Sequence, residues 1–384
     1  MYLTSDSYNY SIHSIFLMRI LHIYKDYHPV MGGIENHLRW LAEAQARRGH
    51  HVTVLVTNPA GMETTVSEEK GVRVIRAARI ATVASTPLSL SLPLILRKEN
   101  PDIVHLQFPY PVGETSQWIM RRGRATIISY QSDVVRQANI LKLYNPLLKR
   151  VLRQADRILA SSPNYIHSSP WLRPLAEKCT VAPLGVDVSR FTQPQPQLTH
   201  AIRQRYPGPI LLFVGRLRYY KGLDYLIRAM QQIDATLLIV GTGPEAARLG
   251  AMSYELNLTD RIHFLGDVGD EMLPAYYHAA DIFVLPSSHR SEAFGIVLIE
   301  AMAAGTPVIS TELGTGTSWV NQNGVTGLVT PPRDANALAT AINQLLHDEN
   351  MRKEMGDRAR ARAQQEFDLP VAVDRIMAAY EEIL

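Results

Sequence analysis

Between two short apolar runs lies the segment Ser291–Met302, which has the sequence SEAFGIVLIEAM. The run before it, Ile282–Pro286, has the length and the β-branched content of a buried strand, as does Pro307–Ser310 after it. The apolar residues Gly295–Ala304 between them predict a buried helix. The segment therefore predicts a strand–helix–strand unit of a parallel sheet.

The same alternation of short apolar runs and amphipathic stretches extends in both directions along the chain. Further helices are predicted at Glu35–Arg48, Asn139–Gln154 and Leu223–Ile233. The predicted fold class is α/β, with two doubly wound, Rossmann-like domains that face a central cleft, where a ligand should bind beyond the carboxyl ends of the strands. The other predicted strands are Arg19–Tyr24, His51–Thr57, Asp102–Leu106, Ala125–Tyr130 and Arg157–Ala160 in the first half, and Ile210–Val214, Thr236–Val240 and Ile262–Leu265 in the second.

Changes in composition suggest where the domains begin and end. A chain of 384 residues suits two domains. Residues 1–17 are rich in Ser and Tyr without periodicity, which indicates a non-native extension before a true start at Met18; a disordered native tail is the alternative. We predict an N-terminal domain over 18–190, a Pro- and Gln-rich linker over 191–208 and a C-terminal domain over 209–384, whose last helix is expected to pack back on the N-terminal domain.

Two glutamates, Glu292 and Glu300, are the acidic residues of the segment that opens this section. If all residues between them are helical, their eight steps separate the carboxylates by about 12 Å. That is wider than the roughly 5–10 Å between carboxylates that act on one glycosidic bond, and it suits two contacts on one extended ligand such as a sugar nucleotide. Gly295 stands where the free N–H groups of the helix would bind a diphosphate. On spacing alone, a surface helix with acidic caps is the simpler interpretation.

The wider segment Arg290–Ile309, with the sequence RSEAFGIVLIEAMAAGTPVI, resembles the donor-site motif of family 4 retaining glycosyltransferases. The resemblance covers essentially all of Met18–Leu384. It implies the GT-B fold, a donor-binding C-terminal domain and an acceptor-binding N-terminal domain. Further matching motifs are Gly32–Glu35, Pro183–Asp187, Val214–Leu217 followed by Lys221-Gly222, Val240–Pro244, Leu265-Gly266 and Gly324–Pro332.

The resemblance assigns roles to individual residues. Arg216 and Lys221 would clamp the donor diphosphate, where fixed cations stabilise the charge gained by the leaving group. Glu300 would bind the ribose hydroxyls, and Glu292 would lie beside the donor sugar. The other implied donor contacts are Gly32 and Gly33, whose lack of Cβ permits close approach, Gly215, Phe294, Gly295, Ile296 and Val297, and, toward the nucleobase, Gly266 and Val268.

One position departs from the family pattern. Gln131 stands where the family usually carries a histidine near the donor sugar. Gln can donate and accept a hydrogen bond but cannot carry a proton charge, so it either keeps the sugar contact or tunes the enzyme to another sugar or a slower rate. Asp133 follows the same strand; it could orient donor or acceptor, or cap the next helix.

Composition and motif spacing limit which cofactors and partners the protein is expected to bind. We expect no cofactor and no metal, because no His, Cys or carboxylate spacing resembles a metal site and no Asp-x-Asp pair is present. Residues 1–190 carry 23 Lys and Arg against 14 Asp and Glu, which suggests an anionic partner such as a membrane surface or lipid diphosphate, although ordinary surface charge is equally consistent. The basic residues are not interleaved with aromatics as in nucleic-acid-binding modules, so nucleic acid is not expected.

Membrane association has one further candidate feature. The predicted helix Asn139–Gln154 is basic and amphipathic, which suits an anionic membrane surface, but also a helix packed on its own sheet. The single Cys179 fits a reducing cytoplasm. We therefore expect a cytoplasmic enzyme, with peripheral contact at the inner face of the membrane as one alternative.

The resemblance, with these features, implies a retaining, metal-independent hexosyltransferase. The donor would be a nucleotide-diphosphate sugar, GDP-mannose or a UDP-hexose, and the acceptor a lipid-linked or glycan hydroxyl. By the resemblance, transfer would be a front-side displacement in which the departing phosphate oxygen helps to deprotonate the acceptor. A GT-B sugar-nucleotide epimerase and a catalytically silent sugar-nucleotide-binding protein remain the alternatives.

Overall fold

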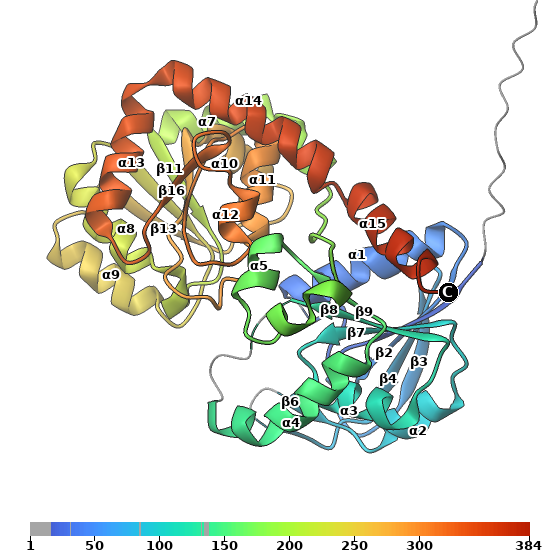
Figure 1. Ribbon diagram of the computed structural model, residues 1–384. Helices are drawn as coiled ribbons and strands as arrows, with labels where there is room; N and C mark the ends of the chain where they lie inside the picture. The colour runs from blue at the N-terminus through green and yellow to red at the C-terminus, as the bar shows by residue number, and fades with distance from the viewer. Residues whose placement is uncertain (1–16, 31, 84–85, 132, 134–137) are drawn as a thin grey trace, which may run out of the picture.

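The computed structural model describes residues 17–30, 32–83, 86–131, 133 and 138–384. They form two α/β units, each with a central sheet flanked by helices, which lie next to one another (Figure 1). The predicted α/β class and the two doubly wound sheets are confirmed. Of the predicted extension over residues 1–17, all but Leu17 lies outside the described residues.

The N-terminal sheet has eight strands in the order β10-β9-β8-β7-β1-β2-β4-β3. All neighbours are parallel except β3 and β4. The chain starts at β1 and builds outward on both sides, so the order reverses between β1 and β7, and a crevice is expected at their carboxyl ends. The strands are β1 (Arg19–Ile23), β2 (His51–Thr57), β3 (Thr65–Glu69), β4 (Val72–Ala77), β7 (Ile103–Phe108), β8 (Ala125–Tyr130), β9 (Arg157–Ala160) and β10 (Cys179–Val181).

Helices cover both faces of this sheet. On one face α1 packs against α15, the last helix of the chain, and on the other α3 packs against both α2 and α4 (Figure 1). A two-stranded hairpin, β5–β6, leads from β4 into α2. The elements are α1 (Gly33–Arg47), β5 (Ala81–Val83), β6 (Thr86–Leu88), α2 (Ser91–Lys98), α3 (Pro111–Met120), α4 (Ala138–Gln154), α5 (Pro163–Ser168), the 3-10 helix η1 (Arg173–Lys178) and α15 (Leu369–Glu381).

The C-terminal sheet has six parallel strands in the order β13-β12-β11-β14-β15-β16, and its order reverses between β11 and β14. The strands are β11 (Ile210–Val214), β12 (Thr236–Val240), β13 (Ile262–Gly266), β14 (Ile282–Leu285), β15 (Val308–Thr311) and β16 (Gly327–Thr330). The helices are η2 (Tyr219–Lys221), α8 (Leu223–Ala229), η3 (Met230–Gln232), α9 (Ala246–Glu255), α10 (Leu273–Ala279), α11 (Ile296–Ala304), α12 (Thr317–Val320), α13 (Ala335–His347) and α14 (Glu349–Glu366).

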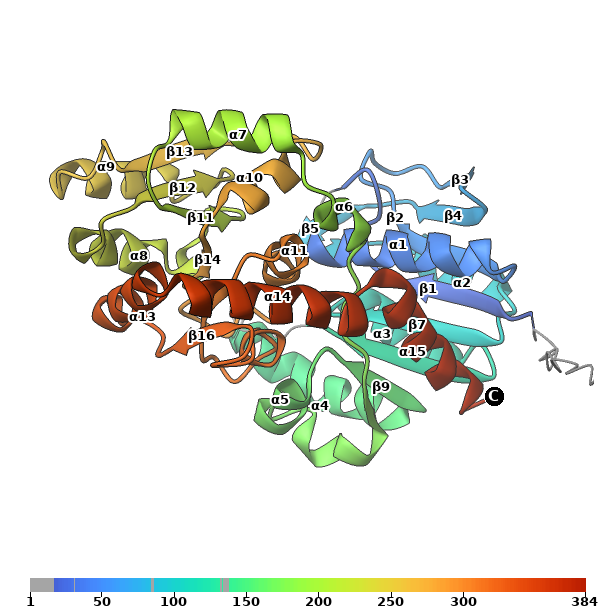
Figure 2. The same ribbon diagram turned by 90° about the horizontal axis from the view of Figure 1, so that it is seen from above.

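The strands are apolar at consecutive positions because helices cover both faces of each sheet. Every residue of β11 and of β14 is buried. The C-terminal core extends from Val186 to Phe367. After α14 the chain crosses back, and Val373 and Tyr380 of α15 are buried with Met18 and other apolar residues of the N-terminal domain (Figure 2).

The predicted linker over 191–208 contains regular structure, contrary to the expectation. α6 (Ser189–Thr192) and α7 (Pro196–Arg205) lie in this region. Pro196 begins α7, where its missing N–H costs nothing. Ile202 and Tyr206, one helical turn apart, are buried in the C-terminal core. Two apolar residues at this spacing are enough to attach a short helix that is otherwise polar.

Candidate active site

The closest charged pair of the predicted site joins Lys221 and Glu292. Lys221 Nζ lies 2.6 Å from Glu292 Oε2, and each side chain is only 10% exposed. Lys221 ends η2, directly after β11, and Glu292 lies between β14 and α11. Gly222 has φ 68°, and a Cβ there would lie 2.0 Å from the carbonyl oxygen of Pro286. Only glycine therefore lets the Lys221 turn pack against the carboxyl end of β14.

Two hydroxyl groups hold Glu292 in place. Ser287 Oγ donates to Glu292 Oε2 at 3.0 Å, and Thr315 Oγ1 donates to the Glu292 carbonyl oxygen at 2.8 Å. Ser287 thus restrains the carboxylate of Glu292, and Thr315 restrains its backbone. The pair therefore presents a cation and an anion in fixed positions at the carboxyl edge of the sheet.

The helix that follows begins beside this pair. α11 starts at Ile296, and its N-cap Gly295 adopts a left-handed conformation with φ 84°. Only four of the eight steps from Glu292 to Glu300 are helical, so the predicted separation of about 12 Å, which assumed eight helical steps, does not apply. The first amides of α11, including Ile296 and Val297, have no carbonyl partner one turn earlier within the helix and can donate to an anion.

The N-terminus of α1 lies opposite that of α11, across the domain boundary. A Cβ built on Gly33, the first residue of α1, would lie 4.0 Å from Ile296 Cδ1. Gly32 is the N-cap of α1, and a Cβ there would lie 2.1 Å from a carboxylate oxygen of Glu35. The structure thus brings Gly32 and Gly33 next to Ile296, although they lie far apart in the sequence.

Glu300 occupies a different environment from Glu292. The Tyr277 hydroxyl on α10 donates to Glu300 Oε2 at 2.6 Å. Burial raises the pKa of Glu300, while this hydrogen bond lowers it. The two glutamates are therefore held by different partners, as expected if they contact different parts of one ligand.

The remaining predicted donor contacts lie at the carboxyl edge of the C-terminal sheet. Gly215 and the exposed Arg216 follow β11, and a Cβ on Gly215 would lie 3.6 Å from Lys221 Nζ. Gly266 ends β13 and pairs with Gly241, and the partly buried Val268 follows it. Phe294 is buried against Phe367 and Trp319, so its ring packs in the core and only its backbone remains for a ligand.

Gln131 lies at the carboxyl end of β8, next to β7. Its Nε2 donates to Gln107 Oε1 at 2.6 Å, and both residues are buried. Gln131 Oε1 and Gln107 Nε2 have no protein partner among the described residues and are shielded from solvent. In this conformation the amide of Gln131 is not open to a sugar, so its predicted sugar contact stays a prediction.

Asp133 joins the two domains. Its Oδ2 accepts from the Arg290 guanidinium at 3.1 Å, and its Oδ1 accepts from Tyr130 and Ser169 hydroxyls at 2.9 and 3.0 Å. Arg290 also donates to the Ser168 hydroxyl of α5 and to two carbonyl groups after β15. Asp133 is therefore held in an interdomain bridge; its alternative role as a cap falls on residues outside the described part of the chain.

Comparisons with known proteins agree with this arrangement. Residues 31–190 match the model described as Glycosyltransferase Family 4, and residues 199–362 match Glycosyl transferases group 1. The chain is 39% identical over 355 residues to D-rhamnosyltransferase WbpZ of Pseudomonas aeruginosa, covering 91% of this chain and 92% of the relative. It is 36% identical over 370 residues to O-antigen chain mannosyltransferase C of Escherichia coli, covering 96% and 99%.

The chain belongs to the family 4 glycosyltransferases. Among solved structures, the glycosyltransferase resembles sucrose-phosphate synthase from Thermosynechococcus elongatus, with a TM-score of 0.78 and 27% identity over 95% of this chain and 98% of the other. The GT-B fold predicted by the resemblance is thus confirmed.

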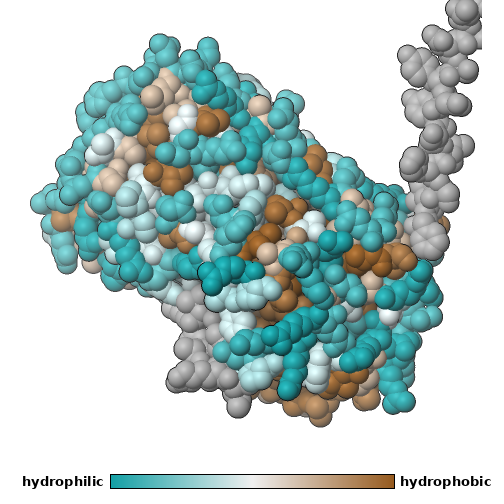
Figure 3. All heavy atoms as spheres, in the orientation of Figure 1, coloured by the Kyte–Doolittle hydropathy of each residue, from teal (hydrophilic) through white to brown (hydrophobic). Residues whose placement is uncertain are grey.

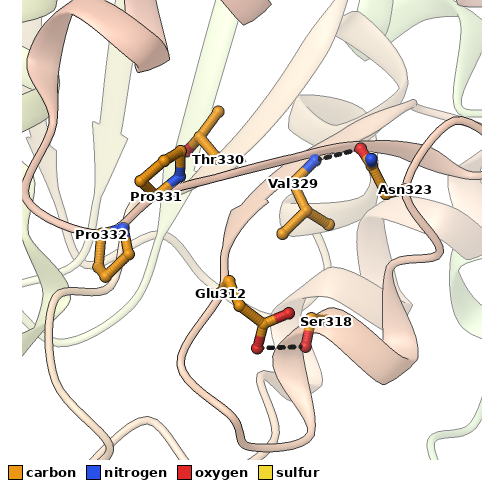
Figure 4. A pocket seen from close by; sticks show the side chains of 7 residues that line it. All are labelled: Glu312, Ser318, Asn323, Val329, Thr330, Pro331 and Pro332. Atoms are coloured by element: carbon orange, nitrogen blue, oxygen red, sulfur yellow. Dashed lines mark hydrogen bonds between the residues drawn. The ribbon is translucent and has the colours of Figure 1, made fainter.

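A separate hollow of about 520 Å³ lies on the C-terminal domain of this glycosyltransferase, lined by residues near β15, α12 and β16 (Figure 4). Within it Ser318 Oγ donates to Glu312 Oε1 at 2.9 Å. Ser318 also accepts from Asn164 of α5, so the hollow adjoins the domain contact. None of the predicted donor contacts lines this hollow. Its lining residues are Glu312, Ser318, Asn323, Val329, Thr330, Pro331 and Pro332.

Several residues that shape the site carried no clear signal in the sequence. Tyr277, Ser287 and Thr315 hold the two glutamates from other elements, and nothing in their local sequence indicates this. Arg290 stood inside the quoted motif, next but one to Glu292, and its charge was the available signal. Within the described part of the chain, no group of three or more His, Cys, Asp or Glu side chains could hold a metal ion, and no helix is long and apolar enough to cross a membrane.

Proposed function

We propose that this glycosyltransferase moves a hexose from a nucleotide-diphosphate sugar, GDP-mannose or a UDP-hexose, to a hydroxyl of a lipid-linked or glycan acceptor. Transfer retains the configuration of the anomeric carbon and needs no metal ion or cofactor. The observation that carries the proposal is the Lys221–Glu292 pair beside the N-terminus of α11. A cation, a carboxylate and free helix amides at one place suit the junction between a sugar and a diphosphate.

The names of the relatives support a mannose-type donor. One is named for D-rhamnosyl and the other for mannosyl transfer. D-Rhamnose is 6-deoxy-D-mannose, so the two sugars share the configuration of every ring carbon. Both names describe transferases, and the alternatives of an epimerase or a silent binding protein are not favoured.

The charges of the site support departure of the diphosphate without a metal. Lys221 and the exposed Arg216 follow the same strand of the donor domain. Fixed cations and helix amides stabilise the charge that develops on a leaving group. In this scheme Arg216 and Lys221 hold the phosphates, and the amides of Ile296 and Val297 complete the clamp.

The partners of Glu292 support retention by front-side displacement. Its carboxylate contacts both Lys221 and Ser287, and these two contacts restrain it beside the sugar, so that it does not act as a mobile base. The acceptor proton then passes to the departing phosphate oxygen, which gains negative charge as the glycosidic bond breaks. The new bond forms on the same face of the sugar.

The test incubates the purified protein with GDP-mannose or a UDP-hexose and a water-soluble glycan acceptor, with and without EDTA. Transfer from at least one donor at an unchanged rate in EDTA is expected. Arg216→Ala should lower turnover by about 10²-fold or more, the scale of losing one charge-stabilising group. Arg248→Ala removes another exposed arginine of the same domain and should leave turnover unchanged. Strict dependence on a divalent ion would overturn the metal-free scheme.

A further inference from the structure

On one face of the N-terminal domain, the exposed charged side chains that the structure describes on three neighbouring helices are all positive. This face is formed by α2, α3 and α4, which lie together below the sheet in Figure 1. The one acidic residue in the sequences of these helices is Glu114, and it is buried. The exposed charged side chains among their described residues are all basic: Arg97, Lys98, Lys149, Arg150 and Arg153.

The opposite face of the same sheet has a different pattern. Its helices, α1 and α15, carry both signs of charge, and Asp374 and Glu381 of α15 are exposed. Arg48 and Asp374 form an ion pair of 2.6 Å on this face. The excess of basic residues in the N-terminal half is therefore concentrated on one face, and an even scatter of surface charge does not describe it.

Exposed apolar side chains lie on α2 and on the hairpin that precedes it. Leu90, which precedes α2, is 75% exposed, and Leu94 within α2 is 59% exposed. Val83 of β5, Leu88 of β6 and Ile80 before the hairpin are also exposed. Figure 3 shows apolar surface gathered along the lower edge of this domain. We call Ile80, Val83, Leu88, Leu90 and Leu94 the apolar rim.

The apolar rim lies at the carboxyl edge of the N-terminal sheet, the edge that contacts the C-terminal domain. The hairpin follows the carboxyl end of β4, and α2 starts directly after it. The Tyr110 hydroxyl, two residues beyond the carboxyl end of β7, donates to the Pro87 carbonyl oxygen in β6 at 3.4 Å. Gln131, at the end of β8, lies along the same edge of the sheet. The rim thus borders the edge where the proposed acceptor enters.

We propose that the α2–α3–α4 face and the apolar rim dock this enzyme on an anionic lipid bilayer. The cations attract anionic headgroups, and the leucine and valine side chains enter the interface between headgroups and acyl chains. A nucleic acid would satisfy the cations but would leave the apolar rim exposed to water. The proposal rests on the proposed function in one respect: docking in this orientation presents the acceptor edge of the cleft to a lipid-linked acceptor.

Vesicle flotation tests the surface directly. The wild-type protein should float with vesicles of phosphatidylcholine and phosphatidylglycerol and should not float with pure phosphatidylcholine. Lys149→Glu/Arg150→Glu should weaken partitioning by at least about 10-fold, since each cation near an anionic surface contributes about fivefold. Leu90→Ser/Leu94→Ser should weaken it by about 10-fold or more through the loss of inserted apolar area. Added salt should weaken wild-type binding.

Matched controls change the same number of charges or apolar groups elsewhere. Arg47→Glu/Lys353→Glu reverses two exposed cations on α1 and α14, away from the proposed face. Leu198→Ser/Tyr254→Ser removes two apolar side chains of the C-terminal domain that are 38% and 75% exposed. Both controls should float like the wild type. Equal losses in the controls and the face variants, or a wild type that does not float, would overturn the proposal.

A second readout separates this proposal from the proposed function. Transfer to a water-soluble acceptor should be the same in the wild type and in all four variants, because none of the changed residues belongs to the donor site. Active protein that ignores anionic vesicles would contradict the docking surface alone. Protein that floats but transfers no sugar would contradict the proposed function alone. Stronger binding to duplex DNA than to anionic vesicles, unaffected by Leu90→Ser/Leu94→Ser, would reject the membrane as partner.

Discussion

Lys221 and Glu292 form a nearly buried ion pair of 2.6 Å, joining the two parts of the chain that the sequence motifs assign to phosphate and to sugar. The pair occupies the carboxyl edge of the C-terminal sheet, between β11 and α11. In the proposed function, a donor bound there would have its anomeric carbon–phosphate bond beside this cation and this anion. Each partner of the pair neutralises a charge that would otherwise be nearly buried alone.

We predict that function and stability can be separated at this pair. Removing one partner leaves a buried charge and should cost about 3–5 kcal/mol of unfolding free energy, whereas neutralising both should cost much less. The double variant Lys221→Met/Glu292→Gln should therefore melt close to the wild type and yet lose at least about 10²-fold in turnover. Calorimetry and transfer kinetics on both singles and the double check this. Near-normal turnover in the double variant would remove the pair from the mechanism.

Glu300 should determine the affinity for the bare nucleotide. Ribose hydroxyls are present with or without the sugar, so Glu300→Ala should weaken nucleoside diphosphate by about 1–3 kcal/mol, or roughly 5- to 150-fold in Kd. Glu292→Ala should not weaken the bare diphosphate, although it should depress transfer. Tyr277→Phe keeps the Glu300 carboxylate and should have the smaller effect on Kd.

Titration calorimetry with the nucleoside diphosphate measures all three variants of this set. If Glu292→Ala abolished binding while Glu300→Ala spared it, the proposed orientation of the donor would be reversed.

The strand–helix alternation was enough to predict the α/β class and most strands within one or two residues, because buried parallel strands are continuous apolar runs. The hairpin β5–β6 and strands β3, β4, β10 and β16 were not predicted. β3 is largely exposed and every residue of β5 is exposed, so neither strand has an apolar periodicity to detect. Helix α7 was not predicted because only Ile202 and Tyr206, in and directly after it, are buried in the core.

The candidate site followed from motifs that lie within one segment, such as Gly295 and Glu300. Contacts between distant segments could not be predicted this way. Ser287 and Tyr277 reach the glutamates only because the sheet places the loops after its strands at one edge. Asp133 shows the same limit: its strand end was predicted, but its partner Arg290 belongs to the other domain.

The Asp133–Arg290 bridge should couple the two domains during catalysis. Asp133→Asn and Arg290→Ala should each lower kcat/KM, and the double variant should lose less than the sum, with a coupling of about 1 kcal/mol or more. A control double-mutant cycle uses the ion pair between Arg19 and Asp102, which is 3.0 Å long and lies within the N-terminal domain. This pair should show no coupling in kcat/KM. Additive losses at Asp133 and Arg290 would mean that the bridge does not act in transfer.

Glu114 should make stability depend on pH. Burial raises its pKa from 4.5 to about 7, against the lowering effect of hydrogen bonds from Tyr144 and the Tyr110 amide. A raised carboxyl pKa stabilises the fold fully below pH 4.5, and this contribution is lost as pH rises through about 7. The loss amounts to about 3 kcal/mol. Denaturant unfolding at pH 4.5, 6 and 8 measures the unfolding free energy of the wild type and of Glu114→Gln. The unfolding free energy of the variant should rise relative to that of the wild type as the pH rises. An equal pH dependence of the two proteins would contradict the assignment.

The configuration of the product tests the central claim most directly. The enzyme is incubated with GDP-α-D-mannose or a UDP-α-hexose and a water-soluble glycan acceptor, and the anomeric proton and carbon of the new linkage are observed by NMR as the product forms. The new linkage is a glycoside, which does not anomerise in water, so its configuration reports the transfer itself. The account predicts an α-linked product, formed at the same rate in EDTA. A β-linked product would contradict retention and front-side transfer at the Lys221–Glu292 site.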